Sequence, residues 1–75
     1  MKAVKVCWLD SRQPNPSWQY IEDIKGQSVE CQTMGFIVHE NDKIIMIAQN
    51  LGDDGEQASG VITIPKACIT SREEI

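Results

Sequence analysis

The sequence predicts a small all-β barrel of five or six short strands with one short helix. Three observations lead to this prediction. Short apolar segments alternate with polar residues at a period of two, and loops rich in proline, glycine or asparagine separate them. Near the C-terminus a β-branched run stops at Pro65 and an isoleucine follows at Ile69, a pattern typical of a strand, a tight turn and a new strand.

The first strand is expected over residues 2–10. Val4, Val6 and Trp8 fall on one face of it, and the other face is half apolar, as in a strand that is covered on both sides. Residues 11–17 contain two prolines and an asparagine, which predicts a loop.

A short helix is predicted over residues 18–25. Ser17 can cap its start and Gly26 can end it. Trp18, Ile21 and Ile24 are spaced at about one helical turn. A strand over residues 18–21 is the competing interpretation.

The middle of the chain predicts three strands, over residues 27–34, 36–40 and 43–49. Gly35 marks a bulge or a sharp bend between the first two. Residues 41–43 form a tight hairpin turn, because Asn and Asp tolerate left-handed backbone. Residues 50–59 are polar, contain glycines, and are expected to form a second loop.

The last segments complete a single domain over residues 1–75. They comprise a strand over residues 60–64, a turn over 65–67, a short strand over 68–71 and a charged tail that frays. This order of elements favours an SH3-like or Sm-like barrel.

A core of this size seldom supplies more than about 3–5 kcal/mol of net stability, so a supplement is expected. The three cysteines are Cys7, Cys31 and Cys68, an odd and scattered count that indicates reduced thiols. Together with one histidine they do not provide the paired ligands of a zinc site. We therefore expect no metal, no cofactor, and a homo-oligomer.

The formal charge of −4 and the dispersed lysines and arginines argue against nucleic-acid binding. No segment has the composition of a signal peptide or the length of a membrane span. The sequence thus predicts a soluble protein of the cytoplasm.

Catalytic motifs are missing from the sequence. His39 and Glu40 are adjacent in a strand and point to opposite faces, so they cannot form an acid–base pair. The acidic run at residues 53–56 lacks the alternating spacing of a calcium loop. No serine stands in a nucleophile motif, and no glycine-rich phosphate loop occurs. The sequence predicts a protein that is not an enzyme.

Aromatic and polar residues gather around the first loop. Tryptophan and tyrosine offer stacking faces for a nucleobase, arginine a phosphate contact and aspartate a hydrogen-bond acceptor. The alternatives are that the tryptophans anchor the core or that the loop contacts a protein. The candidate ligand-binding residues are Trp8, Asp10, Arg12, Trp18 and Tyr20.

Several motifs resemble a group of short bacteriophage-encoded proteins of mostly unassigned function. They are V-x-W-x-D ending at Asp10, the later Trp18, G-F-x-V starting at Gly35, and I-P-x-x-x-I ending at Ile69. The resemblance implies a phage origin and a place in the host cytoplasm. Some small phage proteins are homo-oligomers that sequester nucleotide immune signals without cleaving them, which is the function we expect here.

Two further functions are weighed beside it. The first is a module that binds and inhibits a host protein or serves as a virion accessory. The second is an RNA-binding regulator, because residues 65–75 resemble the end of the carbon storage regulator family, RNA-binding dimers in which Arg72 would contact RNA. The acidic charge and the lack of a basic first strand depart from that family.

Overall fold

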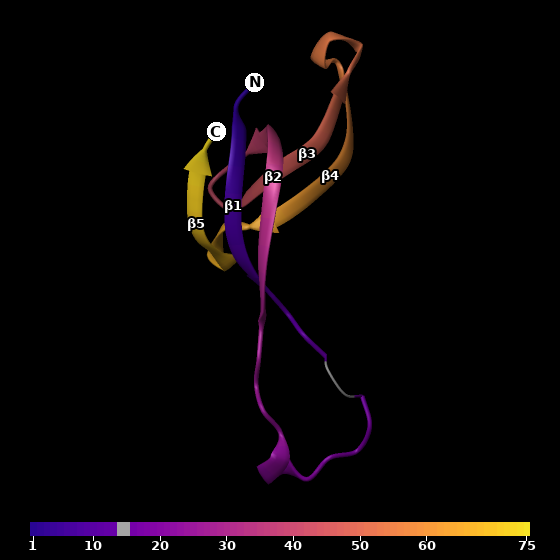
Figure 1. Ribbon diagram of the computed structural model, residues 1–75, viewed down its shortest axis with the longest axis vertical. Helices are drawn as coiled ribbons and strands as arrows, with labels where there is room; N and C mark the ends of the chain where they lie inside the picture. The colour runs from indigo at the N-terminus through magenta and orange to yellow at the C-terminus, as the bar shows by residue number, and fades with distance from the viewer. Residues whose placement is uncertain (14–15) are drawn as a thin grey trace.

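The computed structural model describes residues 1–13 and 16–75 and has one antiparallel sheet of five strands in the order β4-β3-β2-β1-β5 (Figure 1). The prediction of a mainly β protein is confirmed, and the sheet is not closed into a continuous ring of strands. The strands are β1 (Ala3–Asp10), β2 (Val29–Glu40), β3 (Ile44–Gly52), β4 (Gln57–Pro65) and β5 (Ile69–Glu74).

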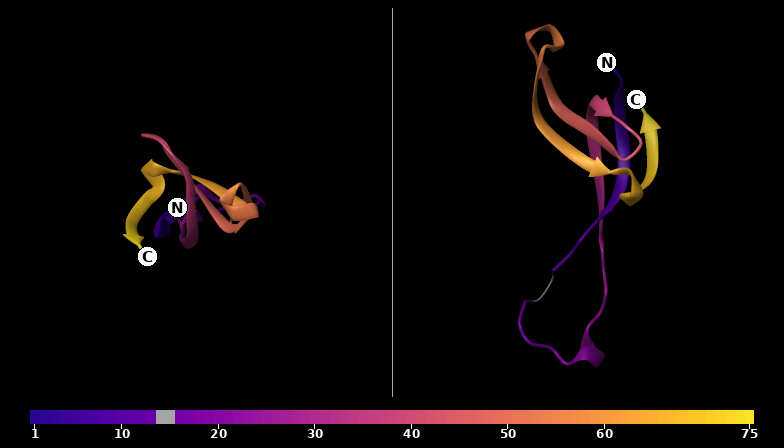
Figure 2. Two further views of the ribbon diagram at one scale, coloured as in Figure 1. Left: turned by 90° about the horizontal axis from the view of Figure 1, so that it is seen from above. Right: turned by 180° about the vertical axis from the view of Figure 1, so that it is seen from behind.

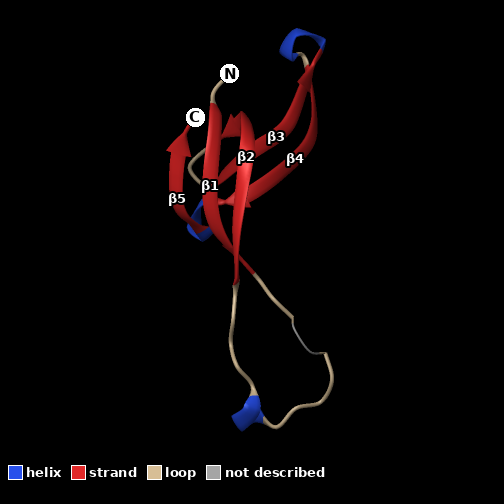
Figure 3. Ribbon diagram, viewed as in Figure 1, coloured by secondary structure: helices blue, strands red, loops and turns tan. Residues whose placement is uncertain are grey.

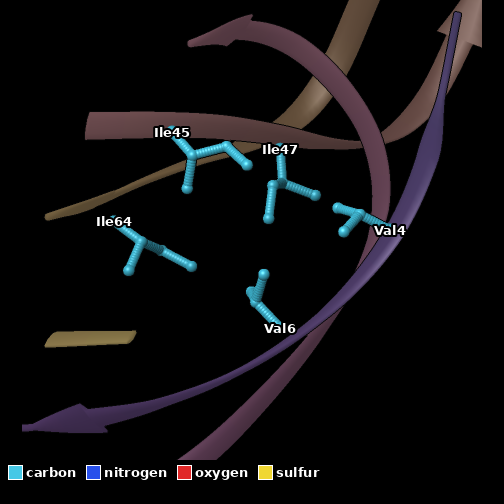
Figure 4. Close-up of a cluster of buried hydrophobic side chains, with 5 residues drawn as sticks. All are labelled: Val4, Val6, Ile45, Ile47 and Ile64. Carbon is cyan, nitrogen blue, oxygen red and sulfur yellow. The ribbon is translucent and has the colours of Figure 1, made fainter. Parts of the chain in front are cut away.

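The core lies between the two halves of the bent sheet (Figure 4). Alternate residues of each strand point inward, so β1 contributes Val4 and Val6, β3 contributes Ile45 and Ile47, and β4 contributes Ile64. All five side chains are fully buried, and Trp8 and Ile69 pack against them half-buried. The predicted inward face of β1 and the return of Ile69 to the core are confirmed.

Strand β2 joins the two halves of the sheet. Its first part pairs with β1 as far as Phe36, and its last part pairs with β3 from Phe36 onward. A register shift lies between Ile37 and His39. Bulges of this kind bend a strand and increase its twist, which lets β1 and β5 face β3 and β4 across the core (Figure 2).

Of the bulge or sharp bend predicted at Gly35, the bulge is wrong, because the register shift of β2 lies between Ile37 and His39. Residues 27–40 contain one strand where two were expected, and the β1–β2 register runs unbroken through the pair of Val4 and Gly35. A Cβ atom at this position would come within 3.0 Å of the Ala48 carbonyl oxygen and the Ile47 Cγ2 atom. Glycine is therefore explained by the close approach of β3.

The helix predicted over residues 18–25 is wrong, and so is the competing strand. The structure has only a three-residue 3-10 helix there, η1 (Ile21–Asp23). The apolar spacing at Trp18, Ile21 and Ile24 has no surface to pack against, since these side chains are exposed. A short helix in a protein is stabilised mainly by packing of its apolar face against other elements. Without that packing, the rest of the segment stays irregular.

The two hairpins differ from each other in how well they were predicted. The turn at residues 41–43 is confirmed, and Asn41 Oδ1 accepts hydrogen bonds from the Lys43 and Ile44 amides at 2.8 and 2.9 Å. The loop predicted over residues 50–59 is wrong for most of its length. Strands β3 and β4 continue through it, and the chain reverses within η2 (Asp53–Gly55), where all three residues have left-handed φ angles.

The C-terminal segment is more ordered than predicted. Strand β4 ends at Pro65 as expected, and the 3-10 helix η3 (Lys66–Cys68) leads into β5. Residues 72–74 do not fray, because they pair with β1 opposite Val6, Lys5 and Val4. Strand β5 therefore extends beyond the predicted Ser71.

Candidate functional site

The described residues between β1 and β2, 11–13 and 16–28, leave the sheet and extend away from it as an arm (Figures 1 and 3), and the other two residues of the loop predicted over 11–17 lie outside the described residues. The molecule is consequently elongated, with extents of 54 × 21 × 20 Å and a radius of gyration of 16.0 Å. A compact chain of this length has a radius of about 11 Å. We call this segment the β1–β2 arm.

The tip of the β1–β2 arm carries large apolar side chains that touch little of the protein. The exposed fraction is 103% for Trp18, 80% for Tyr20 and 87% for Ile21, and Ile24 is also exposed. Single exposed apolar residues are common on protein surfaces, but a contiguous group marks a contact site. The arm tip is therefore the candidate functional site.

An open hollow lies within the arm tip. It has a volume of about 640 Å³ and is lined by Trp18, Gln19, Tyr20 and Asp23. The turn beneath it is held by hydrogen bonds from the Asp23 amide to the Tyr20 carbonyl, 3.0 Å, and from the Ile24 amide to the Ile21 carbonyl, 3.2 Å. The lining brings two aromatic rings and one carboxylate together, and none of these four residues is a cation.

The five candidate residues do not gather at one place. Trp18 and Tyr20 share the hollow of the arm tip. Trp8 lies half-buried against the core and donates from its indole Nε1 to Thr33 Oγ1 at 3.0 Å. The alternative that the tryptophans anchor the core is thus confirmed for Trp8 and wrong for Trp18, which is exposed.

The other two candidates lie near the base of the arm. Asp10 Oδ1 accepts from the Ser11 amide at 2.8 Å, and Arg12 Nη1 donates to Gln27 Oε1 at 3.3 Å. The second contact joins the two ends of the arm. Neither residue lines the aromatic hollow.

The sequence analysis did not predict a polar cluster that the structure places away from the arm. Glu40, at the end of β2, accepts from Arg72 Nη1 at 2.6 Å and Nη2 at 3.0 Å, and forms an ion pair with Lys66 Nζ at 2.7 Å. Lys66 and Arg72 follow Glu40 by 26 and 32 positions in the chain, so no local spacing pattern signals their contact with it. Only the path of the sheet brings them together.

The cations determine the protonation of the carboxylate. Hydrogen bonds from Arg72 and then Lys66 lower the pKa of Glu40 from 4.5 to about 2. The same hydrogen bond raises the pKa of Arg72. The side chains of all three residues are about one third exposed. Arg72, which the resemblance to the carbon storage regulator family would place on RNA, here binds the Glu40 carboxylate.

The cysteines and the remaining polar residues form no metal site in the described chain. Cys7, Cys31 and Cys68 are free and half-buried, and within residues 1–13 and 16–75 no three His, Cys, Asp or Glu side chains are placed to hold a metal ion. His39 is exposed on β2, and the acidic residues of η2 are exposed at a hairpin end.

No helix in the described part of the chain is long and apolar enough to cross a membrane. Comparisons with family models, curated proteins and solved structures found no match to this sequence.

Proposed function

We propose that this protein is a non-enzymatic binding protein that contacts a partner protein through the tip of its β1–β2 arm. The observation that carries the proposal is the full exposure of Trp18 at the end of an extended segment, next to Tyr20 and Ile21. Under the resemblance to phage proteins, the partner is a protein of the bacterial host.

The chemistry of the tip fits an anchor for a protein groove. Tryptophan and tyrosine dominate the binding energy of protein interfaces, because they bury a large area with few rotatable bonds. A projecting apolar element needs a concave apolar partner surface, whereas sites for small molecules are concave in the protein that binds them. The arm projects from the sheet (Figure 2) and so supports the first kind of contact.

Sequestration of a nucleotide-like signal by a homo-oligomer is the second candidate. The observation in its favour is the hollow in which Trp18 and Tyr20 offer two stacking faces. A phosphate would meet Asp23 there and no cation, since Arg12 lies elsewhere. Equilibrium dialysis against cyclic nucleotides, with recovery of the intact ligand after denaturation, tests this candidate.

We further propose that the fold is related to the SH3-like barrels. The position of the last strand β5 beside the first strand β1, the long β1–β2 connection and the 3-10 turn before β5 support this relation. The bend in β2 brings the two halves of the sheet face to face, as a small barrel requires.

The proposed contact is tested by capture of host proteins on the immobilised protein. We expect a host protein that is retained by the wild type and by Met34→Ala, and lost with Trp18→Ala. Met34 is a matched control, because it is an exposed apolar residue, 58%, on the sheet instead of the arm. Equal retention by Trp18→Ala, or no retained protein, would contradict the proposal.

A further inference from the structure

Strand β4 (Gln57–Pro65) forms one edge of the sheet and pairs only with β3 in the described part of the chain (Figure 3). It is nine residues long and contains no charged residue. An edge strand exposes a row of unpaired backbone groups, and proteins usually protect such an edge with charges, especially lysine, or with a proline. In β4 the only such residue is Pro65, at the end of the strand.

The opposite edge of the sheet is protected. Strand β5 carries Arg72, Glu73 and Glu74 in its six residues. Charged side chains of this kind on an edge strand oppose the addition of another strand. The two edges of the sheet therefore differ in whether they tolerate a second copy.

An apolar row crosses the sheet and ends at the β4 edge. The register places Ala3 opposite Phe36, Phe36 opposite Ala48, and Ala48 opposite Val61. Ala48 is fully buried within the row, whereas Val61, its last member, is 43% exposed. Cross-strand neighbours stabilise such rows, and Val61 has a neighbour on one side only.

We infer that two copies of this chain associate by antiparallel pairing of their β4 strands, with the two-fold axis close to Val61. Antiparallel pairing of one strand with itself is self-complementary, as a two-fold interface requires. Pairing about Val61 sets Ile62 opposite Gly60 and Thr63 opposite Ser59 of the second copy. The paired segment is therefore residues 59–63, and Pro65, which cannot donate to a ladder, lies beyond it. Both Val61 side chains then continue the apolar row across the interface.

The small core favours a second copy of the chain as the partner of the β4 edge. The described residues bury six hydrophobic side chains fully: Val4, Val6, Ile45, Ile47, Ala48 and Ile64. Small domains with few buried side chains commonly gain stability from association. A charged peptide partner has no complementary charge to recognise on β4.

The mass of the assembly in solution tests the inference. We expect light scattering after size exclusion to give twice the chain mass of 8.4 kDa for the wild type. Val61→Lys, which sets two cations face to face, should raise the dissociation constant of the dimer by about tenfold or more. Ser71→Lys, on the β5 edge, is the matched control and should keep the wild-type mass.

Three results would overturn the inference. They are a monomeric wild type at high micromolar concentration, a stable dimer of Val61→Lys, and dissociation caused by Ser71→Lys. Trp18→Ala should not change the mass, so the β4 interface can fail or succeed independently of the contact proposed for the arm.

Hydrogen exchange of the wild type gives an independent measurement if the lysine variant does not fold. Backbone amides of residues 59–63 that point away from β3 should lose protection on dilution, and those of β5 should not change. Protection of these amides in residues 59–63 that does not depend on concentration would contradict the β4 interface.

Discussion

Arg72 donates two hydrogen bonds to Glu40, at 2.6 and 3.0 Å, and thereby ties the last strand to the far end of β2. Among the described strands, β5 forms its backbone ladder with β1 alone. The ion pair therefore crosses from one half of the bent sheet to the other. Lys66 strengthens the tie from η3, where its backbone amide also donates to the Lys43 carbonyl at 2.8 Å.

We expect this cluster to make the stability of the protein depend on pH between about 4.5 and 2. The folded pKa of Glu40 is about 2 and its ordinary value is 4.5. In that window the unfolded state binds more protons, so stability falls as the pH falls. The contribution is complete above about pH 4.5, and urea denaturation at a series of pH values measures its loss.

Glu40→Gln is the control that isolates this carboxylate from the others. The variant should be less stable than the wild type at neutral pH, and the difference should shrink as the pH approaches 2. A difference that stays constant across this range would show that Glu40 does not titrate with a lowered pKa in the folded protein.

Gly35→Ala should destabilise the fold by about 1–3 kcal/mol or more, because overpacking forces backbone to move. The new methyl group would meet the Ala48 carbonyl oxygen, which belongs to the backbone of β3 and cannot rotate away. Gly26→Ala is the matched control, since nothing lies within 4 Å of a Cβ atom there. Thermal unfolding followed by circular dichroism compares them, and equal midpoints would refute the explanation given for Gly35.

Ile47→Val should cost about 0.5–1.5 kcal/mol and Ile47→Ala about 2–5 kcal/mol of unfolding free energy. Ile47 is fully buried in the centre of the core (Figure 4). Because a core of this size supplies only about 3–5 kcal/mol, the alanine variant should be largely unfolded at room temperature. Urea titration of both variants measures the effect, and an alanine variant as stable as the wild type would place Ile47 outside the core.

The two tryptophans should differ in their fluorescence. Trp18 is fully exposed and Trp8 is half-buried with its indole bonded to Thr33. We expect the emission spectrum of the wild type to contain a red-shifted component from Trp18 that acrylamide quenches readily. This component should be absent from Trp18→Phe and should remain in Trp8→Phe. Loss of that component in Trp8→Phe would mean that the arm packs against the sheet.

The strands that sequence reasoning predicted well are those whose pattern is local. Val4, Val6 and Trp8 alternate at a period of two, and a strand with that inward face exists. Asn41 sits where its side chain completes a hairpin turn. Pro65 ends its strand because proline lacks the N–H that a longer ladder would need.

The features that were missed depend on distant parts of the chain. Residues 50–52 and 57–59 contain glycine and several polar residues and resemble a loop, yet they pair with each other once η2 reverses the chain. The spacing of Trp18 and Ile21 resembles a helix face, but no surface covers it. Glu40 and Arg72 meet only because β2 bends, which no local pattern encodes.

The separation of the β1–β2 arm from the core has a consequence for how this protein can change. Side chains at the arm tip lie outside the core cluster and are exposed, so exchanges among them would alter the proposed contact with little penalty in folding. Specificity can thus drift quickly while the scaffold stays constant, and the arm is a natural place to graft a new recognition sequence.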